Sequence, residues 1–457
     1  MTSLIAILLF SQLDHFGFTT ITSPQTAGAS FLITVHAYDA TGSPYPFSGY
    51  SRVYSSWDNP INPQYCDTLV LFSNGNWSGY VAVSLAADTL SLVCDDGGGH
   101  TGISNQIQVV ANTPARLLSI LPGQQHTPGL SSGRTGPPTA QTAGVQFNIT
   151  VLITDDWYNM VDTVNHTVSY SSTDSFATQA QVQLVNGTVI VPFAFRTAGP
   201  LHLLFFDDVT SGNIVSDVSS QVAVNPGSYR ALLVIFDSET HLPGDTTTTT
   251  INTPGKEGDA QDKYVNENFT VLVYATDSMW NKTSTTGYSI DVHSTFPFSN
   301  PPPQNLNNGE AQFTVSFSTA EDNTPLWVED NDNDSITFYQ NYLDILAYID
   351  TTVVPDSFLV YPNPMGIGGV NRMLFVYNLS SSCNVVFAIY DPFGNLVYEQ
   401  EISPGSAGAQ SGLNRISWNG RNGENERVAS GLYYAIIKGW THTATVFNEK
   451  MKVGVVW

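Results

Sequence analysis

The sequence contains few charged side chains, and very few of these are basic. Charged residues make up 12% of the 457 residues, and 15 Lys and Arg stand against 39 Asp and Glu, for a formal net charge of −24. No cluster of basic residues offsets this excess, so the surface repels nucleic-acid phosphates and anionic membranes. We therefore expect no nucleic-acid partner and no membrane insertion of the mature chain.

Cysteine is also rare, with three in the chain. Cys66 and Cys94 fall in the same stretch, and a disulfide between them would close a loop worth about 3–4 kcal/mol. The alternative is that both are buried thiols. Cys383 lies in an apolar run that continues through Val385 and Phe387, which indicates a small core residue.

Two motifs of known catalytic sites are missing. The sequence has no His-Glu-x-x-His and no phosphate-binding loop. Its nine histidines are scattered, and none lies close enough to another to suggest a shared metal. We therefore predict no catalytic residues and no enzymatic activity.

What the chain does contain is a pattern that occurs three times, an alternating apolar run that ends in aspartate. A period of two predicts a half-buried strand. Each run is followed by an Asn-Gly pair, typical of a type I′ turn, and then by an acidic pair. The runs are 31–39, 147–155 and 269–277, the turns Asn74-Gly75, Asn186-Gly187 and Asn308-Gly309, and the acidic pairs Asp95-Asp96, Asp207-Asp208 and Glu329-Asp330. Copies lie 112–122 residues apart, which predicts a tandem array of β-rich modules.

These repeats place the domain boundaries. An apolar tail covers 1–12, and the modules cover 13–112, 113–226, 227–350 and 351–457. Two long insertions each follow a Leu-Pro-Gly, at Leu121-Pro122-Gly123 and at Leu242-Pro243-Gly244. Loops this long are uncommon inside compact domains. We expect either lateral contacts between subunits or mobile, solvated loops.

The N-terminal tail is apolar but too short to span a bilayer, and no basic residue precedes it. An ordered segment of this kind has to be buried. It can add a strand to a neighbouring subunit by strand donation, form a strand in its own module, or be the remnant of a signal peptide. The candidate donor residues are Leu4, Ile5, Ala6, Ile7, Leu8, Leu9 and Phe10.

Two resemblances to known families follow from these motifs. Gln25-Thr26-Ala27-Gly28 and Gln141-Thr142-Ala143-Gly144, each followed by Phe-x-Ile-Thr-Val, resemble bacterial Ig-like repeats. Four motifs fall in the last hundred residues: Tyr361-Pro362-Asn363-Pro364, Asp391-Pro392-Phe393-Gly394-Asn395, Trp418-Asn419-Gly420 and Gly431-Leu432-Tyr433. By these motifs the last hundred residues are similar to the C-terminal Ig-like domain shared by the flagellar hook-cap protein and the type IX secretion (Por) sorting modules.

The predicted fold class is therefore all-β, with four tandem Ig-like β-sandwich domains. The second resemblance implies export across an outer membrane and an extracellular or cell-surface location. Trp418 is expected to be a core anchor between two sheets.

Two kinds of modification or ligand site are predicted. Glu329, Asp330, Asp332 and Asp334 could bind Ca²⁺, which takes six to eight oxygen ligands; the alternative is a solvated turn. No other cofactor is expected. Asn-x-Ser/Thr sites for glycosylation occur at Asn76, Asn148, Asn165, Asn186, Asn268, Asn281, Asn333 and Asn378. Asn148 and Asn268 are out of phase with the apolar face of their strands and should point to solvent.

Three functions remain open. The first is a structural subunit of an extracellular filament or appendage, a homopolymer formed by strand donation or domain stacking. The second is a surface adhesin or glycan-binding stalk, with Trp157 and Trp280 as a contact patch. The third is an accessory region of a secreted hydrolase.

Overall fold

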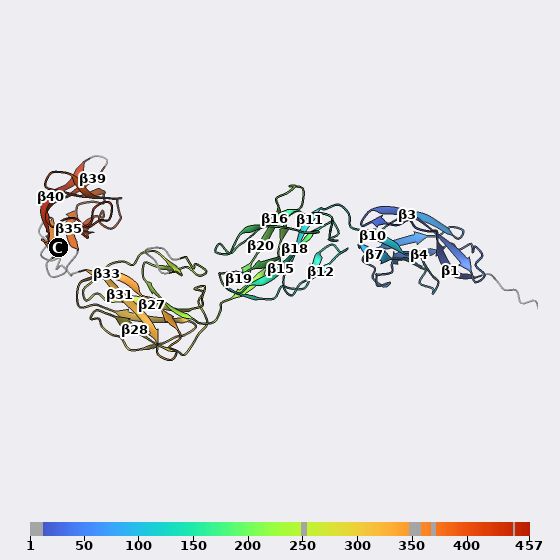
Figure 1. Ribbon diagram of the computed structural model, residues 1–457, viewed down its shortest axis with the longest axis horizontal. Helices are drawn as coiled ribbons and strands as arrows, with labels where there is room; N and C mark the ends of the chain where they lie inside the picture. Colours follow the sequence, from blue (N-terminus) through green and yellow to red (C-terminus); the bar gives the residue numbers. More distant parts are fainter. Residues whose placement is uncertain (1–11, 248–253, 347–357, 367–371, 442–443) are drawn as a thin grey trace, which may run out of the picture. The chain divides into compact units, whose positions relative to one another are not determined.

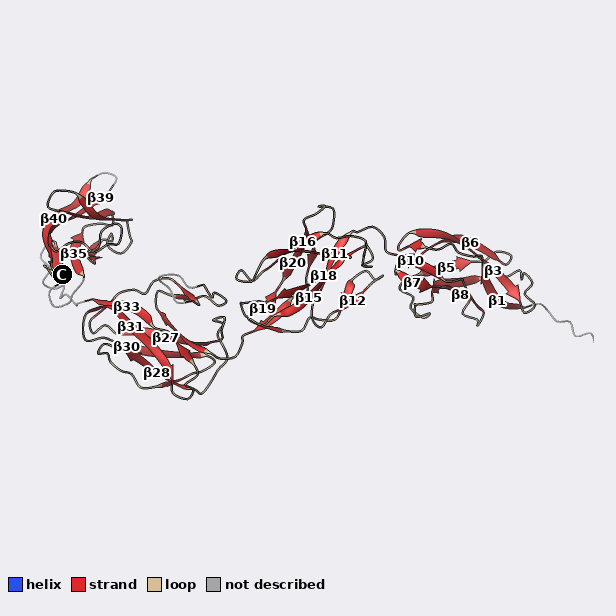
Figure 2. Cartoon of the chain, viewed as in Figure 1, coloured by secondary structure: helices blue, strands red, loops and turns tan. Residues whose placement is uncertain are grey.

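The computed structural model describes residues 12–247, 254–346, 358–366, 372–441 and 444–457. All regular secondary structure in these residues is β-strand (Figures 1 and 2). Within these ranges there is accordingly no helix long and apolar enough to cross a membrane. Two compact units can be distinguished, Met1–Gly227 with Pro243–Thr246, and Ser228–Leu242 with Thr247–Trp457, and each is described by itself.

The first repeat contains ten strands in three sheets, ordered β1-β3-β6, β5-β4-β8-β9 and β2-β10-β7, around one hydrophobic cluster. Alternate residues of the central strand, such as Ile33, Val35 and Ala37, are buried there because successive side chains of a strand point to opposite faces. The strands are β1 (Leu13–Phe18), β2 (Gln25–Thr26), β3 (Ser30–Asp39), β4 (Tyr50–Ser55), β5 (Asp67–Leu71), β6 (Asn76–Ala82), β7 (Ala87–Leu90), β8 (Leu92–Asp95), β9 (Thr101–Ile103) and β10 (Ile107–Val110).

The second repeat has the same plan, with sheets β11-β15-β18, β17-β16-β20-β21 and β14-β22-β19, and a separate hairpin β12-β13. Its core contains Ile149, Val151 and Ile153 of the predicted strand. The strands are β11 (Arg116–Ile120), β12 (Gln125–Thr127), β13 (Gly133–Thr135), β14 (Gln141–Thr142), β15 (Phe147–Thr154), β16 (Thr167–Ser172), β17 (Ala180–Gln183), β18 (Thr188–Phe193), β19 (Gly199–His202), β20 (Leu204–Asp208), β21 (Asp217–Val218) and β22 (Val222–Asn225).

The third repeat has the sheets β30-β27-β23-β32 and β26-β33-β31-β28-β29 and the hairpin β24-β25. One cluster fills the space between the sheets, and a second one forms around Trp280 on the other face of β23. The strands are β23 (Ala231–Phe236), β24 (Thr240–His241), β25 (Lys256–Glu257), β26 (Lys263–Tyr264), β27 (Phe269–Thr276), β28 (Ser289–Ser294), β29 (Gln304–Asn305), β30 (Glu310–Val315), β31 (Glu321–Asp330), β32 (Thr337–Phe338) and β33 (Asn341–Leu346).

The last region has two sheets, β34-β35-β38 and β37-β36-β39-β40, on either side of its own core. Trp418 is 2% exposed in this core, as predicted, and its Nε1 donates to the carbonyl of Arg421. Cys383 is buried there too. The strands are β34 (Leu359–Tyr361), β35 (Met373–Leu379), β36 (Asn384–Tyr390), β37 (Leu396–Ile402), β38 (Gly412–Trp418), β39 (Gly431–Trp440) and β40 (Thr445–Val455).

The three Asn-Gly turns form as predicted, with positive φ at both residues of each pair. Each turn closes a single bridge, however, and the strands that it joins belong to different sheets; β17 and β18, for example, lie in separate sheets. A Cβ on Gly187 would lie 2.2 Å from the carbonyl oxygen of Val161. The turn therefore carries the chain from one sheet to the other. It contacts the end of the repeated strand, where the N–H of Ile153 donates to the carbonyl of Gly187.

The disulfide predicted between Cys66 and Cys94 is not formed, and both thiols are free and buried. Cys94 lies on β8 and Cys66 immediately precedes β5, and β4 separates these two strands in the sheet. Two strand spacings of about 4.8 Å exceed the Cα separation that a disulfide allows. Burial, more than the nearby carboxylates, raises the pKa of each thiol to about 12.

Candidate functional site: the contacts between repeats

The best-defined polar site in the first unit is the turn that follows the repeated strand of the second repeat. The Oδ1 atom of Asp155 accepts hydrogen bonds from the backbone N–H groups of Trp157 and Asn159, at 2.8 and 3.0 Å. Its Oδ2 accepts one from the Asn159 amide at 2.9 Å. The carboxylate at the first position of this turn thus binds backbone N–H groups two and four residues later, and the side chain of Asn159 adds a further bond.

Asn159 connects this turn to the first repeat. Its side chain is 1% exposed. Its Nδ2 donates to the carbonyl of Ser84, and its Oδ1 accepts from the N–H of Ala86, both at 2.8 Å. Asp155 adds a third bond, because its Oδ2 accepts from the N–H of Asn112 at 3.0 Å. Two side chains of one turn thus satisfy three backbone groups of the preceding repeat.

Trp157 packs on the same surface. A Cβ on Gly28, whose φ is +73°, would lie 2.2 Å from the indole Nε1 of Trp157. Gly28 belongs to the Gln-Thr-Ala-Gly element, so the glycine of that element leaves space for a side chain of the next repeat. Trp280, by contrast, is 6% exposed within the third repeat. Trp157 is still 40% exposed, so it is Trp280 that cannot belong to the exposed contact patch expected for an adhesin.

The first insertion is a folded hairpin. Strands β12 and β13 pair with each other, and His126 donates from Nε2 to the carbonyl of Tyr158 at 2.7 Å. Burial is the main cause that lowers the pKa of His126, so this histidine is neutral at pH 7. Arg134 of β13 binds Asp217 at 2.9 Å and the carbonyl of Val218 at 2.6 Å. The insertion is therefore a paired hairpin that packs on its own sheet, and lateral contacts between subunits stay a prediction.

The tip of this hairpin reaches the first repeat. Gly129 has a φ of +78°, and its Cβ position would lie 2.8 Å from the Cα of Leu85 and 2.9 Å from the ring of Tyr65. The Gly129 N–H donates to the carbonyl of Trp157 at 2.8 Å. The tip and the Asp155–Asn159 turn thus hold adjacent parts of the preceding repeat.

The second insertion has the same local structure. His241 of β24 donates to the carbonyl of Trp280 at 2.6 Å, as His126 does to Tyr158. Burial, again the largest cause, lowers the pKa of His241. On β25, Lys256 forms a buried ion pair with Glu239 at 2.5 Å, with each side chain 2% exposed. These two insertions are therefore repeats of one structural element.

The segment Pro243–Thr246 of this insertion belongs to the first unit. A Cβ on Gly244, whose φ is +89°, would lie 2.2 Å from the Oγ1 of Thr197 and 3.0 Å from the ring of Phe176. Thr246 accepts a hydrogen bond from Arg196 at 2.9 Å. Thr197 lies 112 residues after Leu85, so the two glycine tips contact equivalent positions of two successive repeats.

Sequence reasoning aligned these insertions on the wrong residues. The two Leu-Pro-Gly segments are not equivalent, because Leu121-Pro122-Gly123 precedes the first hairpin whereas Leu242-Pro243-Gly244 forms the end of the second. The equivalent segments are His126-Thr127-Pro128-Gly129 and His241-Leu242-Pro243-Gly244. The shared His-x-Pro-Gly was the signal that could have located the hairpin tips.

In the second unit, Arg372 joins the last region to the third repeat. Its guanidinium lies 2.9 Å from Asp262, is hydrogen-bonded to Asp344, and is 3.9 Å from Asp322. Burial raises the pKa of Asp262 and of Asp322, and Arg372 opposes this effect. Nearby, Arg415 lies 5.0 Å above the ring of Tyr264. Sequence reasoning missed this site because its carboxylates come from three separate segments: Asp262 precedes β26, Asp322 lies on β31 and Asp344 on β33.

The predicted Ca²⁺ ligands are not brought together. Asp330 accepts hydrogen bonds from the hydroxyl of Tyr229 and from backbone groups of its own turn, and Asp332 accepts one from the N–H of Ser289. Glu329 points to the opposite face of β31 from Asp330, and it accepts a hydrogen bond from the indole of Trp327. Asp334 is exposed. No group of three or more metal-binding side chains occurs in the part of the chain that the structure describes.

Of the predicted glycosylation sites, Asn281 is 1% exposed and its amide donates to Asp277 at 3.0 Å. Its burial makes it unsuitable for a sugar, in contrast to the prediction. Asn148 and Asn268 face solvent, as their position in the strand predicted. The other sites are exposed, except for the half-buried Asn333, and they are Asn76, Asn165, Asn186 and Asn378. The candidate donor residues Leu4–Phe10 lie outside the described residues.

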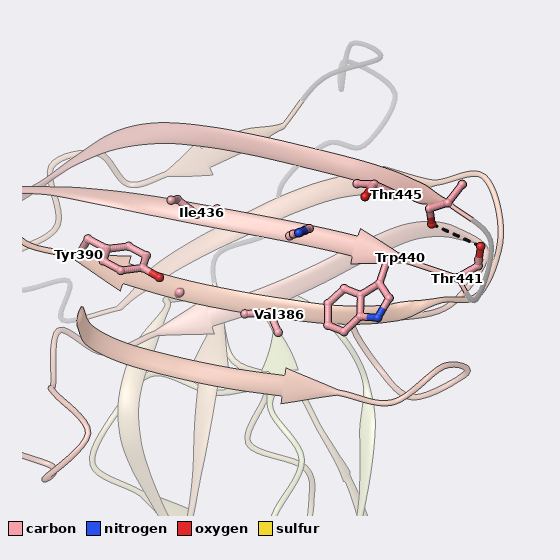
Figure 3. Close-up of a pocket in the computed structure, with 9 residues that line it drawn as sticks. Val386, Tyr390, Ile436, Trp440, Thr441 and Thr445 are labelled. Atoms are coloured by element: carbon pink, nitrogen blue, oxygen red, sulfur yellow. Dashed lines mark hydrogen bonds between the residues drawn. The ribbon is translucent and has the colours of Figure 1, made fainter. Parts of the chain in front are cut away.

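The last region carries an open groove of about 490 Å³ on the outer face of β36 and β39 (Figure 3). Val386 and Ile436 form its floor, Trp440 and Tyr390 stand at its two ends, and Lys438 is the one charged residue among those that line it. Tyr390 and Lys438 are the titratable side chains among the described residues of its lining, which include no carboxylate and no histidine.

Comparison with known proteins locates one family. Residues 365–442 match the model of the FlgD Ig-like domain, which agrees with the hook-cap part of the predicted resemblance. The resemblance to sorting modules remains a prediction. No curated protein matches the chain.

Solved structures with similar arrangements score low. The native α-2-macroglobulin of E. coli is 11% identical over 96% of this chain and 29% of its own, with a TM-score of 0.25. The E. coli adhesin FdeC is 13% identical over 74% of this chain and 100% of its own, with a TM-score of 0.26. Latent PorU from Porphyromonas gingivalis is 13% identical over 78% of this chain and 35% of its own, with a TM-score of 0.18. The chain thus spans about a third or less of α-2-macroglobulin and PorU, and scores this low do not support a transfer of function.

Proposed function

We propose that this chain is a non-catalytic structural subunit of an extracellular filament or surface appendage, in which copies of the chain associate with one another. The observation that carries the proposal is that residues of the repeated motifs contact the preceding repeat. Asp155, Asn159 and the glycine tip at Gly129 all bind the preceding repeat. Residues that recur for such contacts are expected in a protein that holds its modules in a set arrangement.

Three further features support the same function: the contact between the first two repeats, the net charge and the match of the last region. Buried hydrogen bonds and two positive-φ glycines restrict the movement of the second repeat against the first, whereas modules that meet through small polar interfaces normally move. The formal net charge of −24 keeps a secreted assembly soluble. The match of residues 365–442 to an Ig-like domain of a flagellar protein also favours a location outside the cell.

The proposal is tested on the purified full-length chain by analytical ultracentrifugation and negative-stain microscopy over a range of concentrations. We expect polymers whose mass grows with protein concentration. Monomers at every concentration would contradict self-association and favour the alternatives, an adhesin or an accessory region of a secreted hydrolase. A variant without Met1–Phe10 then tests strand donation. Polymers that form equally well without this segment would show that another contact joins the copies.

A further inference from the structure

The three repeats differ at one edge strand. In each repeat this strand pairs with the repeated strand and has no partner on its other side among the described residues: β6 in the first repeat, β18 in the second and β30 in the third. An unpaired edge is a template for another strand, and proteins commonly block it with proline or charge. The three edges therefore show which repeat can accept a strand.

Two of the three edges are blocked. In β18, Pro192 lies opposite Asn148 of β15. In β30, Glu310 is charged and binds Lys282 at 2.6 Å. β6, with the sequence Asn-Trp-Ser-Gly-Tyr-Val-Ala, contains neither proline nor a charged residue. Its residue at the position of Pro192 is Tyr80, 112 residues earlier and opposite Leu32 of β3.

The backbone of Tyr80 points outward from the sheet. The carbonyl of Thr34 on β3 accepts from the N–H of Thr19, so the polar groups of Thr34 are directed away from β6. Ser78 is opposite Thr34, and in an antiparallel pair the backbone groups of such a residue face the other side. Tyr80, two residues further on, has the same orientation. The free edge of β6 thus presents the N–H and C=O groups of Ser78 and Tyr80.

The side chains beside this edge are apolar and uncovered. Tyr80 is 69% exposed and Leu32, opposite it, is 58% exposed. Exposed large side chains on an unblocked edge are the features of a strand that accepts a partner. A strand placed beside β6 with alternate apolar residues would cover the ring of Tyr80.

We propose that β6 of the first repeat is the acceptor for the segment Leu4–Phe10 of another copy, which adds to the sheet as a fourth strand. This inference rests on the proposed function and specifies its contact. The segment has seven residues, all apolar, and β6 also has seven. Neither strand carries a charge that the other would have to bury. Backbone hydrogen bonds supply the binding, and alternate apolar side chains meet the outer face of the sheet.

Geometry favours another copy over the same chain. The segment precedes β1, which lies at the opposite edge of the sheet β1-β3-β6. A strand beyond β6 is three spacings from β1, about 14 Å. The three residue steps from Phe10 to Leu13 reach at most about 11 Å. Leu4–Phe10 of the same chain therefore cannot lie along the whole of β6, whereas the segment of a second copy has no such restriction.

The test uses Tyr80→Pro in the full-length chain. Proline at this position removes an outward N–H and no hydrogen bond within the sheet, and the second repeat tolerates it at Pro192. We expect the variant to fold and to sediment as a monomer. The matched control is Tyr80→Thr, which takes the residue of the third repeat, Thr314, and keeps the N–H. This control should still polymerise, although more weakly.

A mixing experiment identifies donor and acceptor. The Tyr80→Pro chain keeps its donor segment, and a chain without Met1–Phe10 keeps its acceptor edge. Each alone should be monomeric, and a mixture should form a one-to-one dimer in sedimentation equilibrium. If wild-type chains polymerise and Tyr80→Pro chains polymerise equally, or if the mixture stays monomeric, the acceptor assignment is wrong while the proposed function stands. If wild-type chains never associate, the proposed function itself fails.

Discussion

Asn159→Ala is expected to uncouple the first two repeats. The substitution leaves the carbonyl of Ser84 and the N–H of Ala86 without their partner in a buried contact. An unsatisfied buried polar group costs about 1–3 kcal/mol. The two groups together give a loss of about 2–6 kcal/mol, although opening of the contact to water limits the loss to the stability of the interface. A loss of about 2 kcal/mol corresponds to about 30-fold in the equilibrium for opening.

Hydrogen exchange measured by mass spectrometry reports this opening directly. We expect the peptide that contains Ala86 to exchange at least about 30-fold faster in Asn159→Ala than in the wild type. The control is Asn395→Ala, since Asn395 makes the same turn with Asp391 but is exposed. That variant should leave exchange at Ala86 unchanged. Equal exchange in Asn159→Ala and in the wild type would refute the idea that Asn159 holds the two repeats together.

Three further predictions concern the other contacts. Gly129→Ala should accelerate hydrogen exchange around Leu85, because the added Cβ would lie 2.8 Å from the Cα of Leu85. The control is Gly42→Ala, where φ is a similar +80° but the space is open, and it should cost only about 1–2 kcal/mol in its own turn. If the two variants had equal effects on hydrogen exchange around Leu85, the contact would be contradicted. Burial lowers the pKa of His126 in the folded protein below its unfolded value of about 6.5. Because the unfolded chain then binds more protons, the free energy of unfolding should fall as the pH drops below about 6.5. In denaturant titrations at several pH values, His126→Gln should reduce this dependence of the free energy of unfolding on pH. Arg372→Ala should lower the free energy of unfolding of the second unit by roughly 1–3 kcal/mol, which a lower midpoint of thermal unfolding would report. An unchanged midpoint would show that the ion pairs of Arg372 contribute no stability.

Much of the architecture could be predicted from local sequence. Ile33, Val35 and Ala37 alternate with outward-facing residues, and a period of two leaves a strand only one way to bury them. The Asn-Gly turns likewise follow from the two residue types that most readily adopt positive φ. These features depend on neighbours a few residues away, which the sequence displays directly.

The partners of these elements could not be predicted in the same way. The apolar run that ends at Asp155 indicated a strand, but nothing in the sequence around it shows that Asn159 bonds to Ser84, 75 residues earlier. The separation of Cys66 from Cys94 depends on β4, which lies between their strands. In both cases the answer depends on which segments become neighbours in space.

The sequence by itself determined that the chain is a series of β-modules with recurring strands and turns, because side-chain alternation and turn preferences are properties of short stretches. Only the tertiary structure decided which of the three edge strands β6, β18 and β30 is left open. Tyr80, Pro192 and Thr314 became comparable once their pairing partners were known. Strand order and the direction of backbone groups arise from long-range pairing, and these decide where another chain can bind.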